Sequence, residues 1–142
     1  MTKKFDIYER RRARVLVMQS LYEFLLTRHN PDEIAEHVIA ESRYYQYADQ
    51  AYFAEVWRGV ALEAEAIKQQ LAPYLNCAPE AVAPVELAIL VLSTWELLHR
   101  PDVPRKVILD EAVELAKTYG GTEGHQLVNG VLDKLAAEIR KK

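Results

Sequence analysis

The sequence predicts an all-α protein, in which six or seven helices form one compact bundle. Three observations support this fold class. Apolar residues recur at intervals of three and four, which is typical of helices, through most of the 142 residues. No segment alternates apolar and polar residues as a half-buried strand does. Residues that favour helix starts and stops separate the periodic segments.

The first predicted helix begins in solvent and ends in the core. Asp6, with Glu9 three residues later, resembles a capping box and indicates the start. The following turns are rich in arginine, whereas residues 15–26 are apolar nearly all round. A helix that is apolar on every side is buried on several sides. We therefore expect one helix that carries a basic, wet end and a buried end.

Two further helices follow in the first half of the chain. Asn30 and Pro31 indicate the start of the second helix, on which Ile34, Val38 and Ile39 form the inner face. A tyrosine-rich connection comes next, and Asp49 caps a long third helix. Its apolar stripe is the clearest amphipathic signal in the chain: Tyr52, Phe53, Val56, Trp57, Val60, Ala64, Ile67 and Leu71.

Three helices are predicted after a proline-rich central segment, 73–84, which is a connection or carries a short helix. One helix starts at Pro84 or Val85. The next starts around 102–104 and ends at Gly120-Gly121 as at a glycine C-cap. The last opens at 122–123. Its expected inward residues are Leu127, Val128, Val131, Leu132, Leu135 and Ile139.

The composition is that of an ordinary globular protein, but the charge is unevenly distributed. Half of the residues are hydrophobic, and the net charge is −3. Residues 1–14 hold six basic and two acidic side chains, net +4, which leaves −7 for the remaining 128 residues. A basic patch on an acidic body indicates a localised anionic partner, because salt confines each charge's influence to about 10 Å.

The sequence offers no constellation for catalysis. The four histidines and the single cysteine, Cys77, are not at metal-ligand spacing, so we expect no metal and no cofactor. Phosphate-binding loops and nucleophile elbows are absent. Cys77 with His125 is a conceivable nucleophile and base, but an inert cysteine is the favoured interpretation. The sequence lacks an apolar run of membrane-spanning length and a secretion signal, so we expect a cytoplasmic protein that is not an enzyme.

The basic segment predicts an RNA-binding helix face. At about 100° per residue, Arg10, Arg11 and Arg14 share one face, and Arg12 points elsewhere. Guanidinium groups suit both phosphate oxygens and base planes, which favours single-stranded RNA over duplex DNA. A mobile basic arm precedes the helix, namely Lys3 and Lys4. The charge pattern alone leaves a merely solvated helix end as an equal alternative.

Motifs along nearly the whole chain resemble the NusB family of transcription antitermination factors. The amino-terminal match is the run 10–14, Arg-Arg-Arg-Ala-Arg, followed by Gln-Ser-Leu-Tyr at 19–22. The most specific matches are Glu-Ala-Val-Glu-Leu-Ala-Lys at 111–117 and Val-Asn-Gly-Val-Leu-Asp-Lys at 128–134.

The resemblance implies an all-α fold of about seven helices in one domain, 1–142, with helical halves 1–75 and 76–142. It implies binding to the boxA element of ribosomal RNA leader transcripts together with NusE, a small-subunit ribosomal protein. NusA, NusG and RNA polymerase would complete the assembly that prevents premature termination. The implied RNA-binding residues are Lys3, Lys4, Arg10, Arg11, Arg12, Arg14, Glu123, His125 and Leu127. The residues expected to face NusE are Glu86, Asp110, Glu111 and Glu114.

Three positions depart from the family pattern. Gly124 replaces a common serine, Leu127 replaces an aromatic residue, and Val91 replaces a common arginine. Loss of an aromatic removes a platform for base stacking, worth about 1–3 kcal/mol per base. Gly130 lies inside a helical pattern, and we expect it to allow close helix packing rather than ligand contact. Trp57 and Trp95 are expected in the core.

Other function classes remain as alternatives. A NusB-like accessory domain of a ribosomal RNA cytosine methyltransferase would need a catalytic domain that this sequence does not contain. A protein-binding module with idle arginines would bind NusE without a gain in RNA affinity. A DNA-binding regulator is disfavoured, because no helix-turn-helix spacing stands out. The sequence leaves monomer and homodimer open, and a basic stripe specifies phosphates rather than bases.

Overall fold

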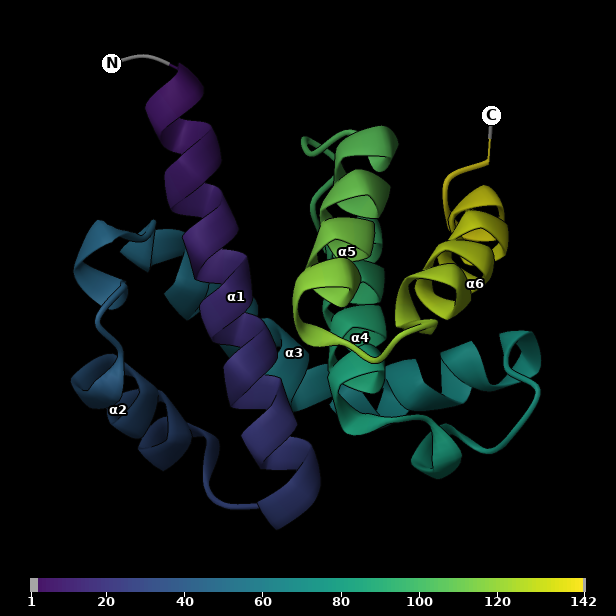
Figure 1. The fold of residues 1–142 in the computed structure, drawn as a ribbon, viewed down its shortest axis with the longest axis horizontal. Helices are drawn as coiled ribbons and strands as arrows, with labels where there is room; N and C mark the ends of the chain where they lie inside the picture. Colours follow the sequence, from purple (N-terminus) through teal and green to yellow (C-terminus); the bar gives the residue numbers. More distant parts are fainter. Residues whose placement is uncertain (1–2, 142) are drawn as a thin grey trace.

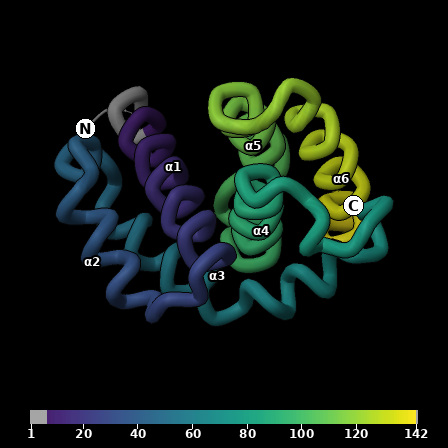
Figure 2. The backbone as a smooth tube through the Cα atoms, turned by 60° about the horizontal axis from the view of Figure 1, so that its bottom comes forward, coloured from purple at the N-terminus to yellow at the C-terminus, as the bar shows by residue number. Residues whose placement is uncertain are grey.

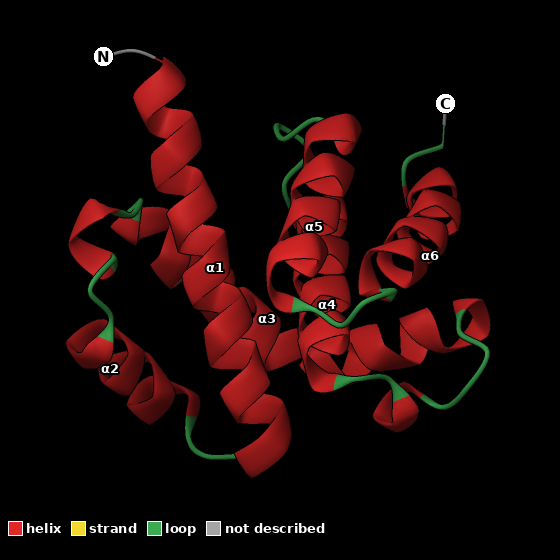
Figure 3. Ribbon diagram, viewed as in Figure 1, coloured by secondary structure: helices red, strands yellow, loops and turns green. Residues whose placement is uncertain are grey.

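The computed structural model describes residues 3–141, and their side chains from residue 7 onward. This part of the chain is all-helical and contains no strand (Figure 3). Six α-helices form instead of about seven, because the connections around residues 45, 73 and 80 carry only short 3-10 helices. The α-helices are α1 (Lys3–Thr27), α2 (Pro31–Glu41), α3 (Gln50–Leu71), α4 (Pro84–His99), α5 (Arg105–Tyr119) and α6 (Gly124–Ile139), and the 3-10 helices are Tyr45–Tyr47, Ala72–Tyr74 and Pro79–Ala81.

The helices pack around α4 (Figures 1 and 2). α1 and α3 lie against α4 from the first half of the chain, and α5 and α6 lie against it from the second half. Every residue of α4 from Glu86 to Leu97 is buried. One hydrophobic cluster contains core residues from both halves of the chain. A helix that is apolar on all sides is stable only when neighbours surround it, and α4 meets that condition.

The first helix extends further toward the amino terminus than the sequence suggested. It is helical from Lys3, so the predicted start at Asp6 is wrong. Its later turns enter the core as expected, with Leu16, Val17 and Leu21 at most 1% exposed.

Local capping chemistry sets the starts of α2 and α3, as predicted. The Asn30 side chain accepts a hydrogen bond from the backbone N–H of Asp32 at 2.8 Å. Asp49 accepts one from the backbone N–H of Tyr52 at 3.0 Å. Each bond satisfies a donor that the first helical turn leaves free. On α2 the expected inner face is only partly right, because Ile39 is exposed.

The two tryptophans belong to the core, as expected. Trp57 on α3 donates its indole N–H to the carbonyl oxygen of Pro31 at 3.0 Å and so ties α3 to the start of α2. Trp95 on α4 lies directly against Gly59 on α3, where any Cβ would overlap the indole ring. The glycine therefore permits α3 and α4 to approach each other closely.

Gly120 and Gly130 act differently from the roles that the sequence suggested. Gly120 ends α5 in an extended conformation with a φ of −88°, so the expected left-handed glycine cap is not formed. A Cβ at Gly120 or Gly124 would instead overlap the Glu86 carboxylate. A Cβ at Gly130 would meet no neighbour within 4 Å, and the residue is exposed, so the expectation of close packing there is wrong.

The carboxyl end of α4 is closed by an arginine from the end of the chain. The Arg140 guanidinium donates hydrogen bonds to the carbonyl oxygens of Glu96 (3.2 Å), Leu97 (3.1 Å), Arg100 (2.8 Å) and Val103 (2.6 Å). The last carbonyls of a helix have no partner within the helix, and a cation at this end also favours the helix dipole. Arg140 therefore joins the end of α6 to the α4–α5 turn.

Candidate nucleic-acid interface

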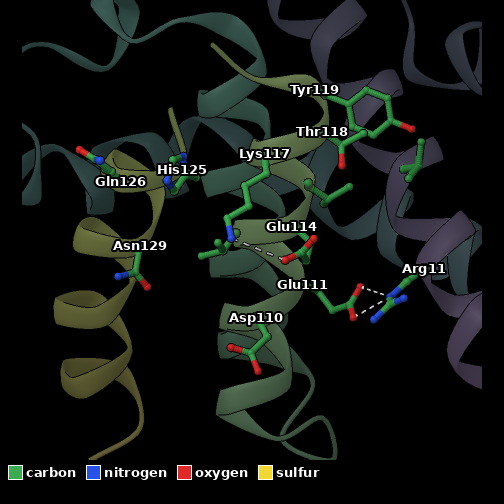
Figure 4. Close-up of a pocket in the computed structure, with 13 residues that line it drawn as sticks. Arg11, Asp110, Glu111, Glu114, Lys117, Thr118, Tyr119, His125, Gln126 and Asn129 are labelled. Carbon is green, nitrogen blue, oxygen red and sulfur yellow. Dashed lines mark hydrogen bonds and ion pairs between the residues drawn. The ribbon is translucent and has the colours of Figure 1, made fainter. Parts of the chain in front are cut away.

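A hollow of about 810 Å³ lies between α1, α5 and α6 (Figure 4). α1 contributes Arg11 and Val15, α5 contributes a long wall, and the first turns of α6 contribute His125, Gln126 and Asn129. Arg11 and His125 are 114 positions apart in the sequence but border the same hollow. The fold thus brings together the two segments that were singled out as RNA-binding.

Arg11 is the basic side chain of α1 that faces this hollow. Its Nε donates to the Glu111 carboxylate of α5 at 2.9 and 3.1 Å, as Figure 4 shows. The Arg11 side chain is 49% exposed, whereas Glu111 is 13% exposed. An ion pair this open to water contributes little to stability, on the order of 0–1 kcal/mol. The outer part of the guanidinium remains accessible to an anion.

Arg10 and Arg12 lie on either side of Arg11 and are half-buried. Arg10 lies over the ring of Tyr52, with 3.8 Å from its Cζ to the ring centroid, and its Nε is 3.5 Å from Oδ2 of Asp49. Arg12 donates from Nη1 to the backbone carbonyl oxygen of Tyr47 at 3.1 Å. Both guanidinium groups are held in place by the protein and keep a part of their surface in solvent.

Arg14 is buried, so the expectation that it shares an exposed stripe with Arg10 and Arg11 is wrong. Its side chain is 4% exposed, and its Nε donates to the Glu96 carboxylate of α4 at 2.9 Å. The Tyr52 hydroxyl donates to the same carboxylate. Burial is the largest single influence and acts to lower the pKa of Arg14, but the charge and hydrogen bond of Glu96 together with the charges of Tyr52 and Glu111 outweigh it, and the pKa is raised. The stripe was expected from helix geometry alone, and a partner on a distant helix removes Arg14 from it.

Tyr52 stays protonated at the centre of this cluster. Its burial and the neighbouring Glu96 carboxylate both disfavour a phenolate, and they raise its pKa well above the ordinary value. A protonated hydroxyl can donate to Glu96, and the ring face can receive Arg10. The network therefore links the base of the arginine segment to the central helix.

Of the residues predicted at the start of α6, only His125 lines the other side of the hollow. Glu123 precedes the helix and is exposed, and His125 is partly buried in the wall of the hollow. Leu127 is 37% exposed, so it does not face inward as its apolar pattern suggested. Lys3 and Lys4 begin α1, and their side chains lie outside the described residues.

The residues expected to face a protein partner separate into two groups. Asp110 and Glu114 project from α5 and are each 63% exposed. Glu111 pairs with Arg11 as described. Glu86 is 4% exposed and accepts a hydrogen bond from the backbone N–H of Gly121 at 2.7 Å. Its carboxylate fixes the α5–α6 turn and does not face solvent.

Exposed tyrosines around the arginine segment were missed by the sequence reasoning. Tyr8, Tyr44, Tyr47 and Tyr119 are 44–58% exposed. The tyrosine-rich connection after α2 was visible in the sequence but was interpreted only as a connection. Tyr119 lies near this connection because α5 packs beside α1, and no local sequence pattern reveals that packing.

Other kinds of site find no support in the described part of the chain. Among these residues no three histidine, cysteine or acidic side chains are grouped so that they could hold a metal ion. None of the helices in residues 3–141 combines the length and the apolar character needed to cross a membrane.

Comparisons with known proteins agree in assigning the chain to one group. The NusB family model matches residues 11–137. The transcription antitermination protein NusB of Azoarcus sp. is 44% identical over 131 residues, 92% of this chain and 84% of that protein. The protein of the same name from Pseudomonas fluorescens is 45% identical, over 94% of this chain and 80% of its own length.

Two solved structures share the fold. The T. maritima NusB structure is 31% identical and superimposes with a TM-score of 0.81 over 90% of both chains. A chain from a complex of antitermination factors NusB and NusE with double-stranded RNA is 23% identical, with a TM-score of 0.78 over 90% of this chain and 96% of that one. At this lower identity the second likeness concerns the fold only.

Proposed function

Because the chain belongs to the NusB family, we propose that it is a transcription antitermination factor that binds boxA-type RNA of ribosomal RNA leader transcripts together with NusE. One observation carries the RNA-binding part. Arg11 of α1 and His125 of α6, which the sequence singled out separately, line one hollow. A role in binding, without catalysis, follows from the same proposal.

The RNA backbone meets the first helix through Arg10, Arg11 and Arg12. The exposed Arg11 can exchange its Glu111 carboxylate for a phosphate, and Arg12 has a backbone carbonyl rather than a carboxylate as its hydrogen-bond partner. Guanidinium forks suit phosphate oxygens. Lys3 and Lys4 add charge at the start of the same helix. Arg14 acts as a positioning residue from its buried ion pair with Glu96.

The RNA path continues to Glu123, His125 and Leu127 at the start of α6. The partly exposed imidazole of His125 and the exposed Leu127 offer flat and apolar surface for a base. Single-stranded RNA presents its base planes as well as its phosphates, so a route between a basic helix and such residues suits it.

NusE binds beside the RNA, on the acidic side of the hollow. Asp110 and Glu114 on α5 are the exposed carboxylates available for this contact, next to Glu111. Glu86 supports that surface indirectly through the α5–α6 turn. The pair then joins NusA, NusG and RNA polymerase in the cytoplasm. We retain the helical halves 1–75 and 76–142 as part of this proposal, which leaves monomer and homodimer open.

The test is fluorescence anisotropy of a labelled boxA RNA, titrated with the protein alone and with NusE over a series of salt concentrations. An Arg11→Ala/Arg12→Ala variant should bind more weakly and with a shallower salt dependence, because each lost phosphate contact reduces counterion release. Arg58→Ala is the matched control, since Arg58 is exposed on α3 and lines a different hollow.

The outcomes separate the candidate functions. Binding that NusE tightens for boxA but not for a scrambled RNA supports the antitermination role. If the protein binds NusE but the mixture gains no affinity for boxA over the scramble, the chain is a protein-binding module and the RNA role is refuted.

A further inference from the structure

Two exposed tyrosines from separate helical regions border a small hollow next to Arg12 and Val15 of α1. The hollow measures about 140 Å³ and is lined by Arg12, Val15, Tyr44 and Tyr119. Tyr44 comes from the connection after α2 and is 54% exposed, and Tyr119 ends α5 and is 44% exposed. The two rings are 75 positions apart in the sequence. Large aromatic side chains left in water around one hollow are available to a partner.

This small hollow continues the larger one between α1, α5 and α6. Val15 and Tyr119 line both, and Figure 4 shows the Tyr119 ring at the edge of the larger hollow that lies toward α1. Tyr44 also lines a third hollow, of about 570 Å³, which follows the later turns of α1 past Gln19 and Tyr22. The shared residues place the three hollows next to one another along α1, with the small hollow at Val15 between the other two.

Charge at the crossing favours an anionic ligand. Within residues 7–141, whose side chains are described, no carboxylate lies at ion-pair distance from Arg12. The backbone carbonyl oxygen of Tyr47 holds its guanidinium at 3.1 Å beside the hollow. An arginine positioned in this way can bind a phosphate without giving up a carboxylate partner.

We propose that Tyr44 and Tyr119 form a base-stacking pair that holds one unpaired RNA base over Val15 while Arg12 binds the adjoining phosphate. The assignment rests on the proposed RNA-binding function and extends the RNA path across α1 toward α2. Aromatic rings can stack on any base, because every base has a π-face. The positive charge of Arg12 beside the rings favours a nucleotide, whose phosphate is anionic, over an apolar side chain of a protein partner. The small volume suits a single flat ring rather than a helix of a protein partner.

The pair also compensates for Leu127. Where the family commonly has an aromatic residue, this chain offers an aliphatic one at the start of α6. Tyr44 and Tyr119 supply aromatic stacking surface at another point of the proposed RNA path.

The test measures boxA RNA binding by anisotropy for Tyr44→Leu, Tyr119→Leu and the double variant. Each single change should weaken binding by about fivefold or more, which corresponds to the loss of one stacked base. Tyr44→Phe and Tyr119→Phe should bind like the unchanged protein, since they keep the ring. A set of RNAs with 2-aminopurine at one position in turn should contain one whose fluorescence is quenched by the protein and recovers with the double variant.

Tyr47→Leu is the matched control, because the Tyr47 side chain is exposed on the same connection but lines none of the three hollows, and the substitution keeps the backbone carbonyl group that holds Arg12. Unchanged thermal unfolding establishes that each variant is folded. If the unchanged protein binds boxA RNA and the double variant binds it equally well, the stacking pair is refuted while the RNA function stands. If the double variant loses only NusE binding, the tyrosines form a protein-docking surface and the proposal is also refuted. Absence of RNA binding by the unchanged protein refutes the proposed function itself.

Discussion

The buried ion pair between Arg14 and Glu96 should be one of the most sensitive points of the fold. The two side chains are 4% and 1% exposed, and their closest atoms, Nε and Oε2, are 2.9 Å apart. Removal of one partner leaves an unpaired charge in the core, which typically costs about 3–5 kcal/mol. We therefore expect Glu96→Leu to lower the free energy of unfolding by about that amount. Arg14→Met should lower it by a similar amount, because it leaves the Glu96 carboxylate with only the Tyr52 hydroxyl.

The double variant Arg14→Met/Glu96→Leu discriminates between a charge effect and a packing effect. It removes both charges together, so its loss of stability should be far smaller than the sum of the two single losses. Urea unfolding followed by circular dichroism at 222 nm measures all three variants. A Glu96→Leu variant that loses less than about 1 kcal/mol, or single losses that simply add, would refute the reasoning. A leucine that merely fits badly would produce additive losses.

Three more changes test other parts of the structure. Gly59→Ala should destabilise the protein by about 1–3 kcal/mol, because its Cβ would overlap the rigid indole of Trp95; thermal unfolding would show this, and an unchanged melting temperature would contradict it. Hydrogen bonding to Arg100 lowers the pKa of Asp102 to about 2, so the stabilising ionised form is fully present above the ordinary pKa near 4 and is lost as the pH falls through 2. Asp102→Asn should therefore flatten the fall in melting temperature between pH 4 and 2, and identical profiles would exclude this contact as a contributor. Arg140→Met should cost on the order of 2 kcal/mol by leaving carbonyl groups at the end of α4 unsatisfied, and native-state hydrogen exchange should show faster opening at the α4–α5 turn but not in α2.

The features predicted well from the sequence are those that depend on neighbouring residues. The cap at Asn30 acts two residues away, and the cap at Asp49 acts three residues away, so a short window contains the whole interaction. The same is true of the apolar stripe of α3, every member of which is buried. Trp57 and Trp95 follow from such stripes as well.

The features that could not be predicted depend on partners far along the chain. Arg14 pairs with Glu96, which lies 82 positions away in the sequence. Helix geometry alone therefore predicted a solvent-exposed face for Arg14, whereas tertiary packing buries it. Glu86 was expected to face a protein partner, but it is buried against the α5–α6 turn, 35 positions away. Gly120 was predicted to be a left-handed helix cap, which depends on the conformational freedom of glycine. In the structure, a side chain at this position would collide with the Glu86 carboxylate.

The candidate site shows the same division. Arg11 and His125 could each be named from sequence, but their shared hollow follows only from the packing of α1 beside α5 and α6. Tyr44 and Tyr119 carry no sequence signal as a pair, because each lies at the end or outside of a helix, where an exposed tyrosine is ordinary.

The position of Arg140 also has a consequence for synthesis of the protein on the ribosome. The carbonyl oxygens of Glu96 and Arg100 at the end of α4 receive their donors from Arg140, which lies 44 and 40 positions later in the chain. A growing chain is threaded through the exit tunnel from its amino terminus, so α1 to α4 emerge while Arg140 is still enclosed. The nascent protein can gather its early helices during translation, but the junction between α4, α5 and α6 closes only after residue 140 has left the tunnel.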